Sequence, residues 1–138
     1  MDGITLTSLN KIYHPKGEIL KVIKKSDTTF SEFGEAYFST INQGDIKGWK
    51  KHTEMILNLV VVVGEIEFVI YNENKKEFFN VKISQDNYKR LTVNSGLWVA
   101  FRGVKSYNML LNLSNIEYNP DEAINADLHK FDYKWIKK

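Results

Sequence analysis

The sequence of 138 residues contains no cysteine, only two prolines and only eight glycines. The absence of cysteine excludes disulfide bonds, thiolate catalysis and cysteine-ligated zinc. The scarcity of proline and glycine argues against a low-complexity chain. An excess of one charge is lacking too, because 19 basic residues stand against 17 acidic ones and leave a net charge of +2. This balance does not predict a nucleic-acid-binding protein.

Long hydrophobic runs are also absent, since the longest, over residues 59–63, is far too short to cross a bilayer. The N-terminus lacks the basic region and apolar core of a signal peptide. We therefore expect a cytoplasmic protein that does not bind the membrane. The length fits one domain over residues 1–138, and the 43% of hydrophobic residues predict a globular fold with a buried core.

Short segments of β-forming residues, separated by turn residues, run through most of the chain. Strands are predicted over residues 18–24, 36–41, 46–52, 56–63, 65–71, 78–83, 89–93, 97–101 and 107–113. This spacing is typical of an all-β sandwich or barrel. Beyond Pro120 the alternation ends; residues 121–123 could open one helical turn, and the segment up to Lys138 is expected to wrap irregularly around the barrel.

The stretch over residues 44–64 has a spacing that resembles the first signature of the cupin superfamily, Gly-x5-His-x-His-x4-Glu-x6-Gly. Gly44 and Gly64 bracket it, Lys50 and His52 hold the two histidine positions, and Leu57 holds the glutamate position. On a strand over residues 46–52, side chains alternate between faces. Gly48, Lys50 and His52 are therefore expected on one face, and Trp49 and Lys51 on the other.

A second cupin signature is matched in spacing by Asn94-x-Gly96-x2-Val99, where the superfamily has Pro-x-Gly-x2-His. Lys50, Leu57 and Val99 thus occupy three of the four positions that hold metal ligands in cupins. A divalent ion needs three or more protein donors, so we expect no metal and no other cofactor. The resemblance implies a cupin-type double-stranded β-helix, which is a jelly-roll barrel.

Within the cupins, the chain resembles the dTDP-4-dehydrorhamnose 3,5-epimerases and the related sugar 3,4-ketoisomerases over about residues 11–135. Four segments carry the likeness: Lys47-Gly48-Trp49-Lys50-Lys51-His52 (Arg-Gly-x-His-Ala-His), Ile83-Ser84-Gln85-Asp86-Asn87 (Leu-Ser-x-x-Asn), residues 91–101 (Leu-x-Ile-Pro-x-Gly-x-x-His-Gly-Phe) and Tyr118-Asn119-Pro120-Asp121-Glu122 (Tyr-x-Pro-x-x-Glu). The epimerases' catalytic histidine falls on Lys50, their catalytic tyrosine near Leu111, and their histidine-orienting aspartate near Asp127. The second histidine of the ketoisomerases is kept as His52.

The resemblance implies proton abstraction next to the ketone of a nucleotide-linked sugar, most simply a dTDP-sugar. That chemistry needs a base, a group that stabilises the enolate oxygen, and an acid. A histidine side chain titrates near neutral pH, so His52 is the candidate base. Lys50 could stabilise the oxyanion or, if partly buried, act as the base instead. Asp127 is the candidate for orienting His52.

Further residues are candidates for holding the substrate. Lys47 and Arg102 could bind its diphosphate, or be ordinary surface charges. Tyr37, Trp49 and Trp98 could stack on its base or sugar, or belong to the core or a dimer contact. Asn58 and Asn112 interrupt apolar strands, so each needs a hydrogen-bond partner, which a ligand could supply. His129 is interpreted as a surface residue.

Three functions remain open at this stage. The first is a cofactor-free epimerase or isomerase of a nucleotide-linked 4-keto sugar in surface-polysaccharide or deoxysugar biosynthesis. The second is a degenerate cupin that binds a nucleotide sugar without turning it over. The third is a partner-binding sandwich without a small ligand, which a filled barrel with no cavity beside His52 would favour. The resemblance also implies a homodimer, in which exposed strand edges become paired.

Overall fold

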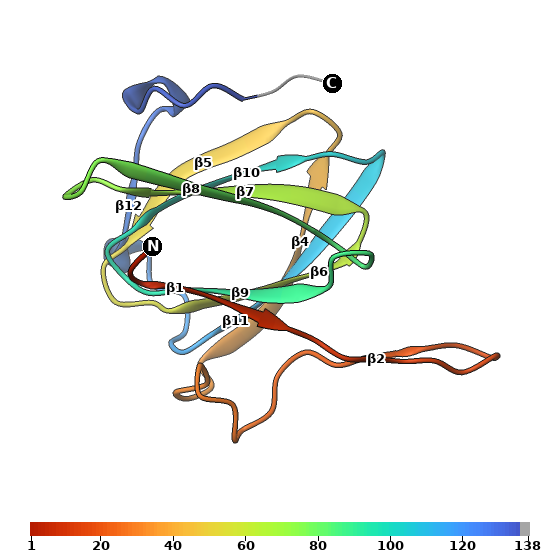
Figure 1. Cartoon of the computed structure of the whole chain (residues 1–138). Helices are drawn as coiled ribbons and strands as arrows, with labels where there is room; N and C mark the ends of the chain where they lie inside the picture. The colour runs from red at the N-terminus through yellow and green to blue at the C-terminus, as the bar shows by residue number, and fades with distance from the viewer. Residues whose placement is uncertain (136–138) are drawn as a thin grey trace.

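The computed structural model describes residues 1–135 and contains two five-stranded antiparallel sheets that face each other (Figure 1). The first sheet has the order β1-β9-β6-β11-β4, with β1 (Ile4–Ser8), β9 (Lys89–Val93), β6 (Leu57–Val63), β11 (Tyr107–Ser114) and β4 (Glu35–Asn42). The second has the order β12-β5-β10-β7-β8, with β12 (Ala123–Asn125), β5 (Ile46–His52), β10 (Trp98–Gly103), β7 (Glu65–Asn72) and β8 (Glu77–Ser84). The predicted all-β jelly-roll barrel is confirmed.

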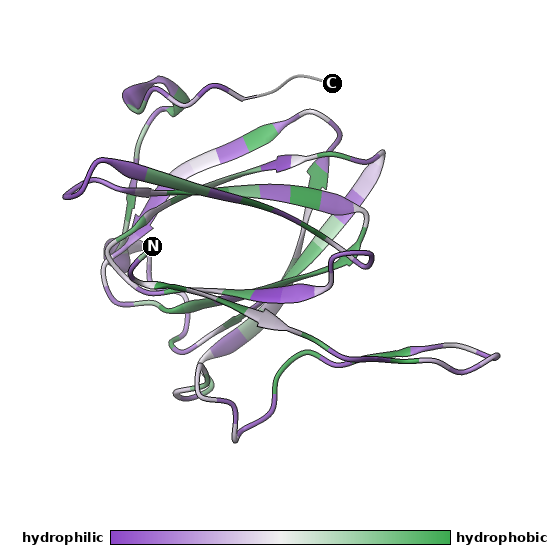
Figure 2. Ribbon diagram, in the orientation of Figure 1, coloured by the Kyte–Doolittle hydropathy of each residue, from purple (hydrophilic) through white to green (hydrophobic). Residues whose placement is uncertain are grey.

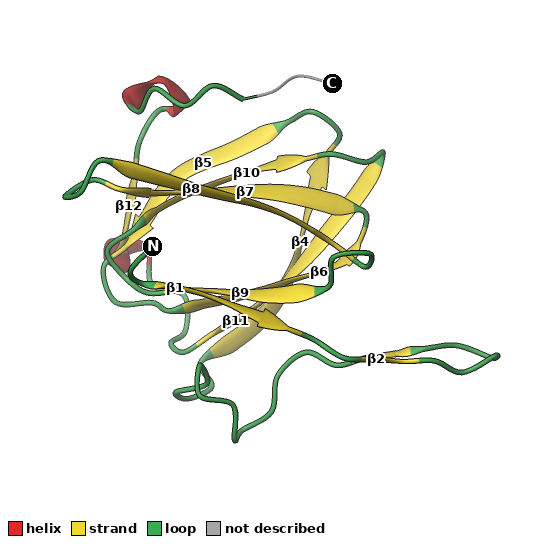
Figure 3. Cartoon of the chain, viewed as in Figure 1, coloured by secondary structure: helices red, strands yellow, loops and turns green. Residues whose placement is uncertain are grey.

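The remaining elements are small. A hairpin of β2 (Lys11–Ile12) and β3 (Ile19–Leu20) projects from the body, and two single-turn helices, η1 (Pro120–Glu122) and η2 (Leu128–Lys130), lie near the C-terminal end (Figure 3). None of the helices within residues 1–135 has the length and apolar character that a membrane span requires.

Eight of the nine predicted strands form, with bounds that shift by no more than two residues. The strand predicted over residues 18–24 is wrong, because only Ile19–Leu20 pairs in a sheet. The chain then crosses the outer face of β9, where the Arg90 guanidinium donates to the carbonyl oxygen of Val22 and the hydroxyl of Thr29. The apolar residues of this segment therefore cover a sheet instead of joining one. β1, β2 and β12 were not predicted from the sequence.

The space between the sheets is filled by apolar side chains at alternate positions along the strands, which point inward. On β7, Ile66, Phe68 and Ile70 are fully buried in this layer, and Figure 2 shows the alternation of hydrophobic and hydrophilic residues at the start of the strand. The other buried side chains of this layer are Ile41, Met55, Leu57, Leu59, Val61, Ile83, Leu91, Val93, Leu97, Val99 and Leu110. The inward residues of β5 and β4 are mostly polar, so this packing gives way to a hollow beside them.

The C-terminal segment covers the outer face of the second sheet. The ring of Phe131 packs on those of Trp49 and Trp98, with centroid distances of 5.5 and 5.2 Å, and Tyr133 and Trp135 extend the same cluster. The predicted irregular wrap is thus confirmed as far as residue 135; residues 136–138 lie outside the described part of the chain. As a result, both faces of β10 are buried.

Candidate active site

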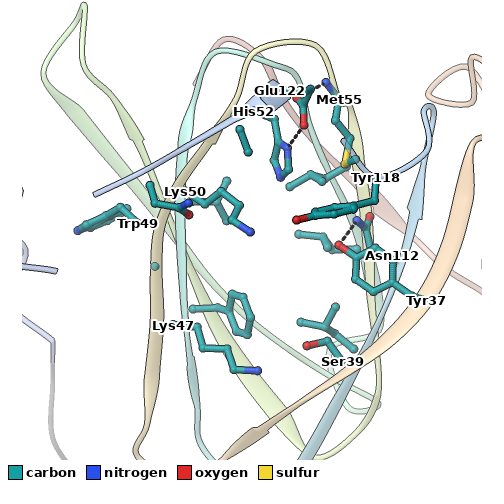
Figure 4. A pocket seen from close by; sticks show the side chains of 18 of the residues that line it. Tyr37, Ser39, Lys47, Trp49, Lys50, His52, Met55, Asn112, Tyr118 and Glu122 are labelled. Atoms are coloured by element: carbon teal, nitrogen blue, oxygen red, sulfur yellow. Dashed lines mark hydrogen bonds and ion pairs between the residues drawn. The ribbon is translucent and has the colours of Figure 1, made fainter. Parts of the chain in front are cut away.

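A cavity of about 650 Å³ lies between the two sheets, beside β4 and β5. Its apolar floor consists of Met55, Leu57, Leu59, Val99, Phe101 and Leu110. Polar side chains converge on it from both walls (Figure 4): Glu35, Tyr37, Ser39, Lys47, Lys50, His52, Asn112, Tyr118, Asn119, Glu122 and Asn125. A largely apolar hollow with a few convergent polar groups is typical of a small-molecule site. The cavity beside His52 disfavours the partner-binding sandwich without a small ligand.

Strand β5 directs Lys47, Lys50 and His52 into the cavity because it contains a bulge. Lys50 is opposite Val99 on β10, but Lys47, three residues earlier, is opposite Phe101, only two residues later. The extra residue lies at Gly48, whose φ of +147° and close approach to Ala100 leave no room for a side chain: a Cβ there would lie 2.5 Å from that of Ala100. Strict alternation would have placed Lys47 on the opposite face.

His52 is held by a carboxylate from a residue that is distant in the sequence. Its Nδ1 lies 2.7 Å from Oε1 of Glu122, and the exposed fractions of the two side chains are 14% and 2%. The other carboxylate oxygen, Oε2, accepts hydrogen bonds from the backbone N–H groups of Glu54 and Met55 at 3.0 and 2.9 Å. Glu122 therefore joins the end of β5 to the loop that follows it.

The protonation of this pair follows from its surroundings. Burial by itself raises the pKa of Glu122, but the hydrogen bonds from Met55, His52 and Glu54 and the charge of His52 outweigh burial and lower it. The carboxylate is thus ionised and can only accept, so Nδ1 of His52 carries the proton that it donates. When the imidazole is neutral, its second ring nitrogen, Nε2, therefore has the free lone pair.

The position of Glu122 is set by the pairing of β12 with β5, in which Ala123 is opposite His52. Thr53 extends this junction, since its N–H and its hydroxyl both donate to the Glu122 carbonyl oxygen, at 2.9 and 2.7 Å. Asp127 has another role: it is exposed, and its carboxylate accepts from the backbone N–H of His129 at the start of η2. The predicted pairing of Asp127 with His52 is therefore wrong. The glutamate of the Tyr-x-Pro-x-x-Glu segment was the signal that could have identified Glu122.

The two cavity lysines differ in their contacts. The ammonium of Lys47 donates to the carbonyl oxygen of Thr40 on β4 at 2.7 Å, which brings it to one side of the opening. Lys50 points into the middle of the cavity (Figure 4), and within residues 1–135 no hydrogen bond or ion pair holds its ammonium. Its charge is therefore available to a ligand.

The wall opposite β5 contains two of the predicted binding residues. Tyr37 on β4 and Asn112 on β11 are directly opposite each other in the strand ladder, and both line the cavity. The amide Nδ2 of Asn112 donates to the hydroxyl oxygen of Tyr37 at 3.0 Å. Asn112 is buried, whereas Tyr37 is 42% exposed and lies near the opening.

The predicted stacking of Trp49 and Trp98 on a ligand is wrong. Both rings lie on the outer face of the second sheet, under the C-terminal segment, and Figure 4 shows Trp49 pointing away from the cavity. The indole N–H of Trp49 donates to the carbonyl oxygen of Leu128, and that of Trp98 donates to Glu73. The alternative interpretation, aromatic core, is the correct one for both.

Arg102 and Asn58 also lie outside the cavity. The Arg102 guanidinium forms an ion pair of 3.0 Å with Glu67 on the outer face of the second sheet, so the predicted diphosphate contact is wrong. The side-chain amide oxygen Oδ1 of Asn58 accepts from the hydroxyl of Thr92 at 2.6 Å on the outer face of β6. Its predicted role in ligand binding is therefore wrong as well. Within residues 1–135, no three side chains of the metal-binding types gather closely enough to hold an ion.

The buried carboxylate makes a testable contribution to stability. Because the native pKa of Glu122 lies below its ordinary value of 4.5, its contribution is fully present above pH 4.5 and is lost as the pH falls through the native pKa. At pH 7, Glu122→Gln should lower the free energy of unfolding by about 1.5–3 kcal/mol, the typical value for hydrogen bonds to charged groups. Urea unfolding between pH 3 and 7 measures the difference, which should shrink in acid. Asp121→Asn, at the exposed neighbouring position, is the control; an equal loss in both variants would contradict the assignment.

Comparison with known proteins gives one family and one set of structures. The FdtA family, described as WxcM-like, C-terminal, matches residues 2–135. A dTDP sugar isomerase from Desulfovibrio desulfuricans G20 is 26% identical, with a TM-score of 0.92 over 97% of this chain and 91% of that one. No curated protein matches the chain.

Two more distant structures share the fold. A point mutant of the 3,4-ketoisomerase QdtA from Thermoanaerobacterium thermosaccharolyticum, in complex with TDP-4-keto-6-deoxyglucose, is 17% identical with a TM-score of 0.78, covering 90% of this chain and 88% of that one. The dTDP-6-deoxy-D-glucose-3,5-epimerase RmlC from Legionella pneumophila, in complex with dTDP-4-keto-L-rhamnose, is 13% identical with a TM-score of 0.81, covering 93% and 74%. The resemblance inferred from the sequence motifs is thus confirmed.

Proposed function

Because the chain belongs to the FdtA family (WxcM-like, C-terminal), we propose that it isomerises a dTDP-linked 4-keto sugar without a cofactor. The observation that carries the proposal is the His52–Glu122 pair at the wall of a cavity that also contains the ammonium of Lys50. The dTDP sugar isomerase that shares 26% of its residues supports the class of substrate.

In the proposed reaction, Nε2 of His52 takes a proton from the carbon next to the ketone. The electron pair of the broken C–H bond forms a C=C bond, and the carbonyl oxygen becomes an enolate that the Lys50 ammonium stabilises. His52 then returns the proton to the former carbonyl carbon. The neighbouring hydroxyl becomes the new ketone as its proton is passed to the enolate oxygen, so atoms and electrons balance without an oxidant.

The remaining cavity residues suit the rest of such a substrate. Lys47, at one side of the opening, would bind the diphosphate. Tyr118 is 70% exposed, and Figure 4 shows its ring over the cavity, where it offers an aromatic face to the base. These two side chains would hold the nucleotide outside, with the sugar directed toward His52.

Isomerisation fits the cavity better than epimerisation at two carbons. A proton shift between adjacent carbons on one face needs a single base, whereas inversion needs an acid on the opposite face. The epimerases' tyrosine falls near Leu111, which is absent from the cavity lining, and its inward neighbours on β11 are Leu110 and Asn112. Neither of these two cavity-lining residues of β11 carries a phenol.

The test is the product formed from dTDP-4-keto-6-deoxyglucose, identified by NMR. We expect the 3-keto isomer. Inversion at a carbon next to the ketone would identify an epimerase instead, and tight binding without turnover would identify the degenerate cupin. Neither binding nor turnover with any dTDP-4-keto sugar would overturn the proposal.

We also propose that the chain is a homodimer. β4 is an edge strand, since within residues 1–135 it pairs in its sheet only with β11, and Phe38 on its outer face is 62% exposed. Tyr13, on the projecting hairpin, is 76% exposed. Because a two-stranded hairpin is only marginally stable by itself, contact with a second copy of the chain would stabilise it. Light scattering should give twice the chain mass of 16.1 kDa, with Phe38→Asp shifting it toward the monomer. A wild-type monomer at micromolar concentration would exclude the dimer.

The single domain and the cytoplasmic location remain predictions.

A further inference from the structure

The amide of Asn112 has one hydrogen-bonding group without a partner. Its side chain is 1% exposed and lines the cavity, and Nδ2 is bonded to the Tyr37 hydroxyl. The carbonyl oxygen Oδ1 has no hydrogen-bond partner within residues 1–135. A buried amide carbonyl without a partner destabilises the protein, so such groups are nearly always paired in folded proteins. An unpaired acceptor facing a cavity indicates a ligand that donates to it.

The hydrogen bond between Asn112 and Tyr37 also determines what the phenol can do. Since the Tyr37 oxygen accepts from Nδ2, its own O–H proton is directed elsewhere. The pair therefore presents one acceptor, Oδ1 of Asn112, and one donor, the hydroxyl of Tyr37, on the same wall. A single hydroxyl group, which both donates and accepts, complements this arrangement.

We propose that Asn112 and Tyr37 together bind one ring hydroxyl of the substrate sugar and so select sugars that carry it. The inference rests on the proposed function and adds a specificity determinant to it. The edge of a thymine base also offers a donor beside an acceptor, but Asn112 is buried on the wall across from His52 and Lys50, whereas the exposed Tyr118 is placed for the base. The sugar is therefore the better match.

The first experiment compares the binding of dTDP and dTDP-glucose by calorimetry. In the wild type, dTDP-glucose should bind more tightly than dTDP. Asn112→Leu, which keeps the volume and removes the amide, should weaken dTDP-glucose binding about tenfold and leave dTDP binding within about twofold. Tyr37→Phe should have the same effect, and as an exposed side chain it is expected to leave folding intact. Thr92→Val, which removes a buried hydrogen bond of the same sheet outside the cavity, should change neither affinity.

The second experiment tests whether the two side chains act on one hydroxyl. In the double variant, the loss should be close to that of either single variant, because both remove the same bond network. The 2- and 3-deoxy analogues of dTDP-glucose each lack one of the two ring hydroxyls that a 4-keto-6-deoxy sugar keeps, and one of them should bind the wild type about tenfold more weakly than dTDP-glucose does. On the Asn112→Leu variant, that analogue and dTDP-glucose should bind with the same affinity.

The outcomes separate this inference from the proposed function. Equal weakening of dTDP and dTDP-glucose would assign the pair to the base, and unchanged affinities would assign it to structure alone; each overturns the inference and leaves the isomerase proposal standing. Strictly additive losses, or no coupled deoxy analogue, would also overturn it. A wild-type protein that binds neither ligand would overturn the inference and the proposed function together.

Discussion

Replacing His52 with asparagine should lower kcat for the dTDP-4-keto sugar about 10³-fold, since a well-placed general base contributes about 10²–10⁴-fold. Asparagine keeps a side-chain donor for Glu122 but has no group that takes up a proton near neutral pH. The affinity for dTDP should remain within about threefold, because the imidazole lies at the sugar and the nucleotide is held at the opening. Steady-state kinetics and calorimetry measure the two quantities.

His129→Asn is the matched control for this substitution. His129 is exposed and follows Asp127 at the surface, so its replacement should change neither kcat nor dTDP affinity. A His52→Asn variant that retains most of its kcat would contradict the role of His52, and would direct attention to Lys50 as the base. An equal loss of kcat and of dTDP affinity would indicate a damaged cavity instead of a missing base.

Replacing Lys50 with methionine should lower kcat about 10²-fold, the order of effect expected when one group that stabilises a developing oxyanion is removed. Methionine approximates the length and volume of the lysine stem without its charge. Because the enolate carries its negative charge only after proton abstraction, the loss should appear mainly in kcat, with little change in KM.

Lys51→Met provides the control on the same strand. Its ammonium lies on the outer face of β5, 5.0 Å from the ring centroid of Trp98, so removing its charge should leave the kinetics unchanged. A Lys50→Met variant with a raised KM and an unchanged kcat would contradict the oxyanion role. Such a result would assign Lys50 to the diphosphate together with Lys47.

The strands were predictable because turn residues and β-forming segments are local properties. Which face of each strand points to the cavity was not predictable. On β10, Trp98 and Arg102 share one face, and Val99 and Phe101 share the other, but both faces are buried. Without the C-terminal segment in place, hydrophobicity cannot tell the outer face from the cavity face. The predicted ligand roles of Trp98 and Arg102 failed for this reason.

The partner of His52 was not predictable from local pattern either. Glu122 is 70 residues away in sequence, and only the pairing of β12 with β5 brings it to the imidazole. Asp127 and Glu122 lie in the same C-terminal segment, and sequence spacing alone does not say which carboxylate ends at β5. In contrast, His52 and Lys50 were correctly expected on one face, since the spacing of two along a strand is independent of the bulge before them.

The most direct measurement of the central claim is deuterium exchange in D₂O, with dTDP-4-keto-6-deoxyglucose followed by proton NMR. If the imidazole held by Glu122 abstracts a proton beside the ketone, the wild type should exchange that carbon-bound hydrogen for deuterium, and His52→Asn should not do so above the rate without protein. Substrate that binds but keeps all its carbon-bound hydrogens over many hours, or exchange that persists unchanged in His52→Asn, would contradict the claim.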